Sequence, residues 1–311
     1  MNHGNERVAL VTGATGFIGS HLASRLVRDG WEVHLVVRPE SDMAVLAELR
    51  GSVTVHAHDG TTNGLQAIVS TAAPRTVFHL ASLFLSDHRS ADIERLVSSN
   101  LLFATQLAEA MVQAGVRQLI NTGTSWQHFE GRDYCPVNLY AATKQAFEAI
   151  LAYYVETTPL RVITLKLYDT YGPGDRRQKL FHLLRQVAER QEPLAMSPGE
   201  QLIDLVHIDD VLEAYISAAD LLLQERIAGH ESFAVSSGAP IKLKDLVAAY
   251  ARLLGRDLPI QWGGRPYRSR EVMIPWHSGT ALPGWQPRVS LEEGLSQLIA
   301  AAEGQPAGGR R

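Results

Sequence analysis

The sequence predicts an α/β protein in which a doubly wound parallel sheet is joined to a smaller C-terminal domain. Two observations lead to this prediction. Short apolar runs typical of buried parallel strands alternate with helical patterns as far as Leu167. A glycine-rich turn directly follows the first of these runs. The chain has 311 residues, 45% of them hydrophobic, so it can bury a core large enough for both parts.

The first strand, turn and helix carry a nucleotide-binding motif. The apolar run Val8–Val11 precedes glycines spaced as G-x-x-G-x-x-G, one residue away from the G-x-G-x-x-G fingerprint. Such glycines permit a tight turn, close approach of a pyrophosphate and close packing of helix on strand, with the anion at the helix N-terminus. We therefore expect a Rossmann-type domain whose turn contacts a dinucleotide through Gly13, Thr15, Gly16, Phe17, Ile18 and Gly19.

The second predicted strand, 33–37, ends at Arg38, where an acidic residue would bind the 2′-hydroxyl of the adenosine ribose. An arginine suits a 2′-phosphate instead. The sequence therefore favours NADPH or NADP⁺ over NAD. A surface arginine that simply leaves the strand is the alternative interpretation.

A later helix carries Tyr140 and Lys144, which are spaced i and i+4 and so share one face. A phenol titrates near pH ~10, and a neighbouring cation lowers that pKa because it favours the phenolate. Tyr140 is therefore a candidate general acid or base for a carbonyl or an alcohol. An amphipathic helix with one buried tyrosine and one solvated lysine has the same spacing, and the glycine turn favours the catalytic interpretation.

Together these motifs resemble the NAD-dependent epimerase/dehydratase family, extended short-chain dehydrogenases/reductases that act on nucleotide sugars. The resemblance covers nearly the whole chain and includes Tyr171-Gly172-Pro173 and the segment 204–211. It implies that Lys144 keeps Tyr140 acidic and orients the nicotinamide ribose. Asn100 is expected to open a helix at 101–114. Further cofactor contacts implied by the resemblance are Asp59, Gly60, Leu80, Ala81, Ser82 and Asn100.

The resemblance also assigns a catalytic hydroxyl to Thr124, which follows a strand at 118–121. Thr124 would hold the substrate oxygen that Tyr140 protonates, with help from Ser125. Dehydratases of the family follow this threonine with Asp-Glu, but here Ser125 and Trp126 follow it, which disfavours dehydration. The segments 123–128 and 138–145 resemble 4-ketoreductases of the CDP-abequose synthase type.

We therefore expect NADPH-dependent reduction of the 4-keto group of a nucleotide-linked 4-keto-6-deoxyhexose. Two alternatives stay open: a nucleotide-sugar 4-epimerase with tightly held NAD, and a catalytically silent NADP(H)-sensing protein on the same fold. Lys166 and Asp169 stand where many relatives carry Arg and Asn, which alters the expected sugar contacts. The candidate substrate-binding residues are Ser82, Trp126, His128, Asp169 and Arg270, the last favoured over Arg265 and Arg268 as a diphosphate ligand.

The chain divides into a cofactor domain, 1–167 with about 204–235, and a substrate domain, 168–203 with 236–311. The helix before the Thr124 strand and the helix that carries Tyr140 are expected to form a four-helix homodimer interface. The apolar positions expected near this interface, or else in the core, are Leu107, Met111, Phe147 and Leu151.

Composition argues against several other classes of protein. A net charge of −4 gives no basic patch for nucleic acid. No apolar run approaches ~18 residues and the N-terminus lacks a signal-like segment, so we expect a soluble cytoplasmic protein with no membrane contact. The His and Asp residues lack the spacing of metal ligands, so no metal is expected. The single Cys135 cannot form an internal disulfide.

Overall fold

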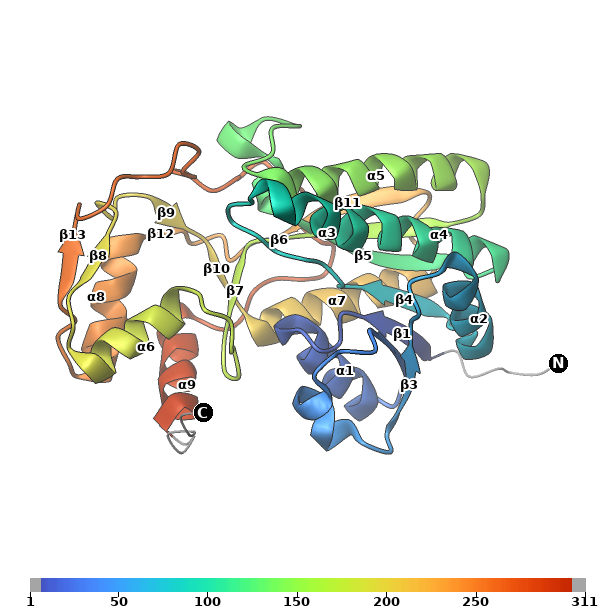
Figure 1. Cartoon of the computed structure of the whole chain (residues 1–311), viewed down its shortest axis with the longest axis horizontal. Coiled ribbons are helices and arrows are strands. Elements are labelled where there is room, and N and C mark those ends of the chain that lie inside the picture. The colour runs from blue at the N-terminus through green and yellow to red at the C-terminus, as the bar shows by residue number, and fades with distance from the viewer. Residues whose placement is uncertain (1–6, 304–311) are drawn as a thin grey trace.

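The computed structural model describes residues 7–303 and contains a seven-stranded sheet in the order β11-β6-β5-β4-β1-β2-β3. All of its neighbouring strands are parallel. The strands are β1 (Val8–Thr12), β2 (Glu32–Val37), β3 (Val53–Ala57), β4 (Thr76–His79), β5 (Gln118–Thr124), β6 (Arg161–Leu167) and β11 (His230–Val235). Helices cover both faces of the sheet, which confirms the predicted doubly wound fold (Figure 1).

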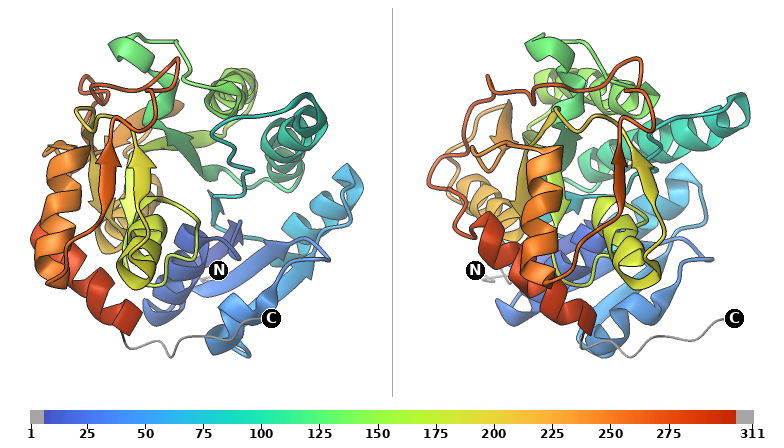
Figure 2. Two further views of the ribbon diagram at one scale, coloured as in Figure 1. Left: turned by 60° about the vertical axis from the view of Figure 1, so that its left-hand side comes forward. Right: turned by 90° about the vertical axis from the view of Figure 1, so that its left-hand side faces the viewer.

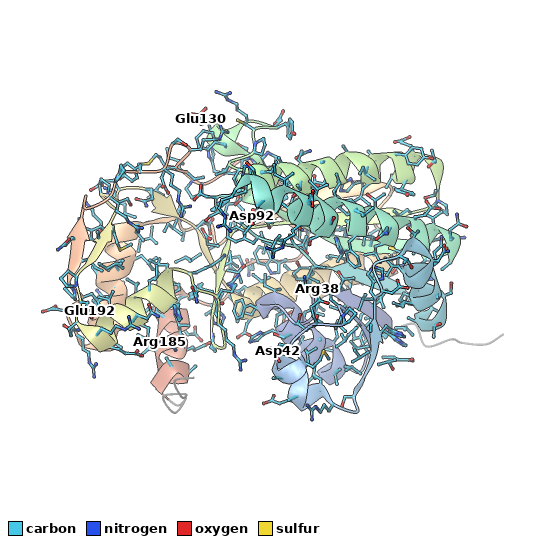
Figure 3. All side chains as sticks on the ribbon, in the orientation of Figure 1. Arg38, Asp42, Asp92, Glu130, Arg185 and Glu192 are labelled. Atoms are coloured by element: carbon cyan, nitrogen blue, oxygen red, sulfur yellow. The ribbon has the colours of Figure 1, made fainter. Side chains whose placement is uncertain are left out.

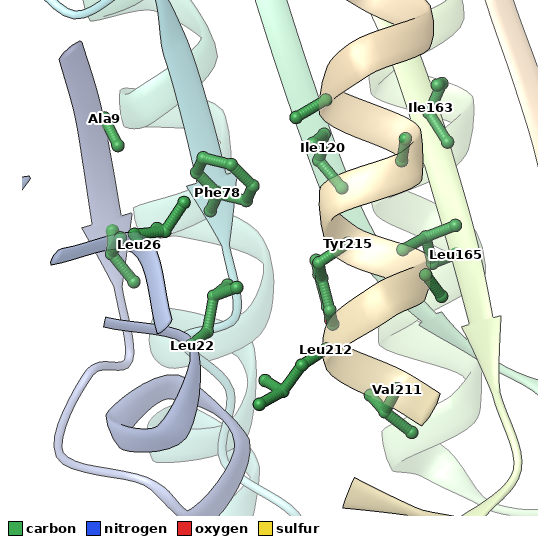
Figure 4. Close-up of a cluster of buried hydrophobic side chains, with 14 of the residues drawn as sticks. Ala9, Leu22, Leu26, Phe78, Ile120, Ile163, Leu165, Val211, Leu212 and Tyr215 are labelled. Carbon is green, nitrogen blue, oxygen red and sulfur yellow. The ribbon is translucent and has the colours of Figure 1, made fainter. Parts of the chain in front are cut away.

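Two apolar cores explain why the strands read as continuous apolar runs. The helices on the sheet are α1 (Phe17–Arg28), α2 (Thr62–Ala72), α3 (Ile93–Val97), α4 (Phe103–Gln113), α5 (Leu139–Thr157) and α7 (Ile208–Leu223). Figure 4 shows α1 and α7 meeting one face through Leu22 and Tyr215. The helices α2, α4 and α5 bury the other face. Along β1, Leu10 belongs to the second core and its neighbour Val11 to the first, as strand alternation requires.

A smaller set of elements follows Tyr168. It contains three two-stranded pairings and a third apolar cluster. The strands are β7 (Asp169–Tyr171) with β10 (Leu205–His207), β9 (Leu202–Ile203) with β12 (Ile241–Lys242), and β8 (Leu194–Met196) with β13 (Ile260–Trp262). The helices are α6 (Leu180–Arg190), α8 (Leu243–Leu254) and α9 (Leu291–Glu303). These three helices gather at the end of the molecule opposite α2 and α4 and face the viewer in the right-hand view of Figure 2.

The segment 204–235 joins these two parts. Its strand β10 pairs with β7, whereas α7 and β11 return to the seven-stranded sheet. The division into a cofactor domain and a substrate domain stays a proposal, and its terminal residues 1–6 and 304–311 lie outside the described residues.

The helix expected to open at Asn100 starts earlier. Helix α3 runs through a π-helical segment, Ser98–Leu102, into α4. Asn100 lies within this π turn and is 2% exposed, so the predicted position at a helix start was wrong. Such π turns inside α-helices are frequent at functional sites.

The apolar residues expected at a dimer interface are core residues. Leu107, Met111, Phe147 and Leu151 are at most 1% exposed and belong to the core between α2, α4, α5 and the sheet. The core alternative therefore holds for these four residues. An apolar stripe on a helix indicates a buried face but not whether a sheet or a second protein covers it. Large exposed apolar side chains lie on α3 (Ile93 and Val97), at the end of the π-helical segment (Leu102) and on α5 (Tyr153).

None of the helices between residues 7 and 303 combines the length and apolar character that a membrane span requires. Within the same range, no group of three or more His, Cys, Asp and Glu side chains is arranged to hold a metal ion. The cytoplasmic location stays a prediction.

Candidate active site

The glycine turn lies between β1 and β4, where the strand order of the sheet reverses. Gly13 has φ of 74°, and a Cβ there would stand 2.6 Å from the amide nitrogen of Ala81. A Cβ at Gly19 would stand 2.2 Å from the carbonyl oxygen of Gly13. Helix α1 begins after Gly16 with no side-chain cap, so its first amide groups can bind an anion. The turn therefore fits a dinucleotide pyrophosphate, at the position where such ligands bind in open α/β sheets.

The remaining cofactor candidates surround the same end of the sheet. Thr15, Phe17 and Ile18 are half-buried in the turn, and Leu80 and Ala81 follow β4 beside it. Asp59, after β3, accepts hydrogen bonds from the amide and hydroxyl of Thr61 at 2.9 and 2.8 Å, which lower its pKa. Gly60 follows with φ of 87°.

Arg38 extends into solvent at the end of β2. Its side chain is 72% exposed, and its Nε lies 3.4 Å from a carboxylate oxygen of Glu40. Figure 3 places it beside the seven-stranded sheet, far from Arg185 on α6. The side chain is therefore free to turn towards a group bound at the edge of β2.

Thr124 is the last residue of β5, and its Oγ1 accepts from the Trp126 amide at 3.3 Å. Tyr140 lies in the first turn of α5, which Asn138 caps by accepting from the Ala141 amide at 2.9 Å. The Phe84 ring links Tyr140 to the segment that follows Thr124. Its centroid lies 5.0 Å from that of Tyr140, which it contacts edge-on, and 5.7 Å from that of Trp126. The structure thus places Tyr140 near the end of β5.

The pKa of Tyr140 lies above its usual value, whereas the spacing with Lys144 predicts a value below it. Burial raises the pKa of Tyr140 to about 12, and the lowering contributions come from a hydrogen bond with Ser82 and the charge of Arg177. Lys144 is itself 3% exposed, and burial lowers its pKa to about 8 although Glu148 opposes this. Desolvation therefore dominates for both groups, which spacing along a helix cannot reveal. The alternative of a solvated lysine is excluded.

Asn100 uses its amide within the protein. Its Nδ2 donates to the Leu83 carbonyl and to Thr143 Oγ1, both at 3.0 Å. Its Oδ1 accepts from the Leu83 amide at 2.7 Å and from Ser82 Oγ at 3.2 Å. Thr143 in turn donates to the carbonyl of Tyr140 at 2.7 Å. Asn100 therefore ties the loop after β4 to the first turn of α5.

A cavity of about 700 Å³ opens beside these residues and extends towards α6 and α8. At the catalytic end it is lined by Phe84, Trp126 and Asp169, and burial raises the pKa of the Asp169 carboxyl. Its lining is rich in cationic side chains: Arg177, Lys179, Arg185, Arg265 and Arg268. Arg270 lines only a smaller neighbouring cavity, where it donates to Cys135 Sγ at 3.1 Å and covers the Phe129 ring.

Sequence reasoning missed Arg177 and Lys179. Arg177 forms an ion pair with Asp175, with its Nη2 2.7 Å from a carboxylate oxygen, and covers the Phe17 ring. Lys179 places its Nζ over the Phe84 ring, 4.8 Å from the centroid, and burial lowers its pKa. The available signal was the basic run directly after Tyr171-Gly172-Pro173, which spans residues 176–179.

Comparison with known proteins agrees with this architecture. The family model for "NAD dependent epimerase/dehydratase family" matches residues 9–227. The chain is 25% identical to the CDP-abequose synthase of Salmonella muenchen over 96% of this chain and 99% of that protein. It is 29% identical to the UDP-glucose 4-epimerase of Mycolicibacterium smegmatis, with 93% and 96% covered.

Solved structures show the same fold. MoeE5 in complex with UDP-glucuronic acid and NAD superposes with a TM-score of 0.78 at 27% identity, covering 95% of this chain and 98% of that one. The UDP-glucose 4-epimerase of Thermotoga maritima with UDP-glucose gives a TM-score of 0.81 at 23% identity, with the same coverage. The glycine turn, the Thr124, Tyr140 and Lys144 set and these likenesses agree: the chain belongs to the NAD-dependent epimerase/dehydratase family of enzymes.

Proposed function

We propose that this protein reduces the 4-keto group of a nucleotide-linked 4-keto-6-deoxyhexose, with NADPH as the cofactor. The observation that carries the proposal is Tyr140, whose burial raises its pKa to about 12. At neutral pH the phenol therefore keeps its proton, which is the form that donates to a developing alkoxide. An epimerase must first remove a proton from an alcohol, and a tyrosine with this pKa is not in the phenolate form that this step requires at neutral pH.

The cofactor contacts proposed are the glycine turn for the pyrophosphate, Arg38 for a 2′-phosphate and Lys144 for the nicotinamide ribose. The close approach of Gly13 to Ala81 and of Gly19 to Gly13 supports this fit. When bound, a nicotinamide cofactor supplies the hydride that the keto carbon receives. The relatives with NAD bound favour NAD, so Arg38 is the one residue on which the NADPH preference depends.

The residues of this chain supply the proton and the orientation. Tyr140 donates its phenolic proton to the substrate oxygen, and the Thr124 hydroxyl donates a hydrogen bond to the same oxygen, with Ser125 beside it. Asn100 holds Ser82 and the first turn of α5 in place through its four hydrogen bonds. Lys144 carries a positive charge at neutral pH because its pKa of about 8 lies above that pH.

The substrate diphosphate is proposed to lie against Lys179 and Arg268 in the cavity of about 700 Å³. Lys179 is half-buried, and an ammonium held away from water favours an anionic partner. An arginine adds a planar fork that matches a phosphate. Arg268 replaces Arg270 in this role, because Arg270 is engaged by Phe129 and Cys135.

The proposal is tested with a panel of nucleotide-linked 4-keto-6-deoxyhexoses and NADPH. We expect the nicotinamide absorbance to fall as the sugar is reduced and the product mass to rise by that of two hydrogen atoms. The second candidate is a nucleotide-sugar 4-epimerase, which the names of several relatives favour. Inversion of a UDP-hexose by the purified protein with no added cofactor would replace our proposal with this one.

Cofactor choice is expected to depend on Arg38. Arg38→Asp should weaken NADPH binding about tenfold or more relative to NADH, because it removes a charge-assisted contact of roughly 1.5–3 kcal/mol and adds repulsion. Fluorescence titration of both cofactors measures the ratio without turnover. The exposed Arg28→Asp, at the end of α1, is the control for added negative charge. An unchanged ratio, or a wild type that prefers NADH, would contradict the role of Arg38.

We also propose a homodimer formed through α3, α4 and α5. The exposed side chains of Ile93, Val97, Leu102 and Tyr153 supply its apolar surface, in place of the buried residues expected from the sequence. Static light scattering should give twice the chain mass at micromolar concentration, and Leu102→Glu should shift it towards the monomer. A monomer in the wild type under these conditions would remove the proposal.

A further inference from the structure

A buried ion pair lies directly behind the end of β5. Lys166 on β6 and Glu148 on α5 are 5% and 8% exposed, and the Nζ of Lys166 lies 3.3 Å from Oε2 of Glu148. Removing two charges from water is costly, and a buried pair is weak evidence for added stability. A role in positioning other groups explains its location better.

One branch of contacts runs from this pair to the catalytic threonine. Glu148 Oε1 accepts from Gln127 Nε2 at 2.8 Å, and Gln127 Oε1 accepts from the Thr124 amide at 2.9 Å. A Cβ at Gly123 would stand 2.9 Å from Gln127 Oε1 and 3.2 Å from Glu148 Oε1. The strand therefore approaches these two side chains as closely as a glycine allows, and Gln127 fixes the main chain of Thr124.

The other branch runs from Lys166 to His128, whose Nε2 lies 2.8 Å from the ammonium. His128 Nδ1 is 3.1 Å from the Arg132 carbonyl, which can only accept, so Nδ1 carries the proton and Nε2 accepts from Lys166. The imidazole stacks on Trp276 with centroids 3.9 Å apart and an interplanar angle of 14°. Lys166 thereby fixes the orientation of both rings.

The two branches end at the same place. Ser125, Trp126, His128 and Trp276 line a cavity of about 110 Å³, which shares Trp126 and Asp169 with the larger cavity. Lys166 is thus linked to Thr124 through Glu148 and Gln127, and to the part of the cavity wall formed by His128 and Trp276 through His128. A lysine can serve both partners because its three donors rotate around a single point, whereas the guanidinium of an arginine is a fixed planar fork.

We propose that Lys166 is a positioning residue that sets the geometry of Thr124 and of the His128–Trp276 wall together, and so controls both turnover and the affinity for the sugar. The inference rests on the proposed function, because it assumes that the substrate ketone lies at Thr124. The Thr124 branch governs turnover, and the His128 branch governs the affinity for the sugar.

The central test is the double variant Lys166→Met/Glu148→Gln. It removes both charges at once, so neither is left buried and unpaired, and the amide oxygen introduced at position 148 can still accept from Gln127. With the 4-keto sugar that the wild type reduces best, we expect kcat to fall about tenfold to a hundredfold, because small displacements of catalytic groups have effects of this size. KM should rise. The affinity for NADPH is titrated separately, because the variant also removes the Glu148 charge that raises the pKa of Lys144.

Two single variants separate the branches and remain informative if the double variant does not fold. Gln127→Met keeps the length of the side chain but removes its hydrogen bonds to Thr124, Glu148 and Gln145, so it should lower kcat with little change in KM. His128→Phe keeps a ring to stack on Trp276 but removes the acceptor for Lys166, so it should raise KM with little change in kcat. Equal effects of both variants on kcat and KM would contradict two separate branches.

The control is Lys244→Met/Glu200→Gln, which removes an ion pair of the same composition whose side chains are 40% and 46% exposed. It should leave kcat and KM unchanged. If Lys166→Met/Glu148→Gln lowers only the melting temperature and leaves kcat and KM at wild-type values, the pair is purely structural and the inference is wrong.

A measurement that needs no turnover distinguishes this failure from failure of the proposed function. If the wild type reduces none of the sugars, the function is wrong, but nitrogen NMR of His128 still reports on Lys166. We expect a neutral ring protonated at Nδ1, with an Nε2 shift that changes in Lys166→Met/Glu148→Gln. An unchanged shift would show that Lys166 does not hold His128.

Discussion

Tyr140→Phe is expected to lower turnover by roughly 10²–10⁴-fold, the usual contribution of general acid–base catalysis. The variant keeps the ring that contacts Phe84 but removes the proton that the alkoxide would receive. Burial keeps the Tyr140 phenol protonated at neutral pH, so the wild-type residue is present in its proton-donating form. A phenylalanine has no proton to donate. NADPH affinity should stay close to that of the wild type, so that only kcat falls.

Steady-state kinetics and a fluorescence titration of NADPH measure the two quantities separately. Tyr134→Phe is the matched control, because Tyr134 is 61% exposed in the loop before α5 and loses the same atom. Reduction of the ketone by Tyr140→Phe at nearly the wild-type rate would mean that another group supplies the proton.

Gly19→Ala should weaken cofactor binding by roughly a hundredfold. The added Cβ would stand 2.2 Å from the carbonyl oxygen of Gly13 and 2.7 Å from its carbonyl carbon, so the methyl group would overlap main-chain atoms of the glycine turn. Overpacking of this kind costs up to about 3 kcal/mol, which corresponds to a loss of roughly a hundredfold in affinity. Gly16→Ala should have a weaker effect, because its Cβ would stand 3.2 Å from the same oxygen.

Gly30→Ala is the control for the cost of the substitution itself. Gly30 follows the same helix, has φ of 80°, and a Cβ there would meet nothing within 4 Å. It should lower the melting temperature through backbone strain but leave the NADPH affinity unchanged. The pyrophosphate site would have to lie elsewhere if Gly19→Ala bound NADPH as tightly as the wild type does.

The parts of the fold that depend on local pattern could be predicted from the sequence. The first strand, turn and helix follow from an apolar run, three glycines and a helical period within twenty-odd residues, and the structure has β1 and α1 there. The sharing of one helix by Tyr140 and Lys144 likewise follows from their spacing. In each of these cases neighbours in sequence determine the geometry.

Features that depend on distant segments could not be predicted. The pKa of Tyr140 depends on how much of the chain buries it, and Arg177 reaches Phe17 only because the segment after β7 folds back onto α1. The π turn at Asn100 depends on contacts with Leu83 and Thr143, which lie in two other segments. A helical period contains none of this information.

The strand β11 completes the seven-stranded sheet late in the chain, and this has a consequence for biosynthesis. Its register with β6 runs from His230 opposite Val162 to Val235 opposite Leu167. Until β11 leaves the ribosome, β6 is an open edge whose Val162, Ile163 and Leu165 would be fully buried in the finished protein. Unpaired apolar edges bind other chains, and long-range parallel pairing is slow. A fragment that ends after β6 is therefore expected to aggregate.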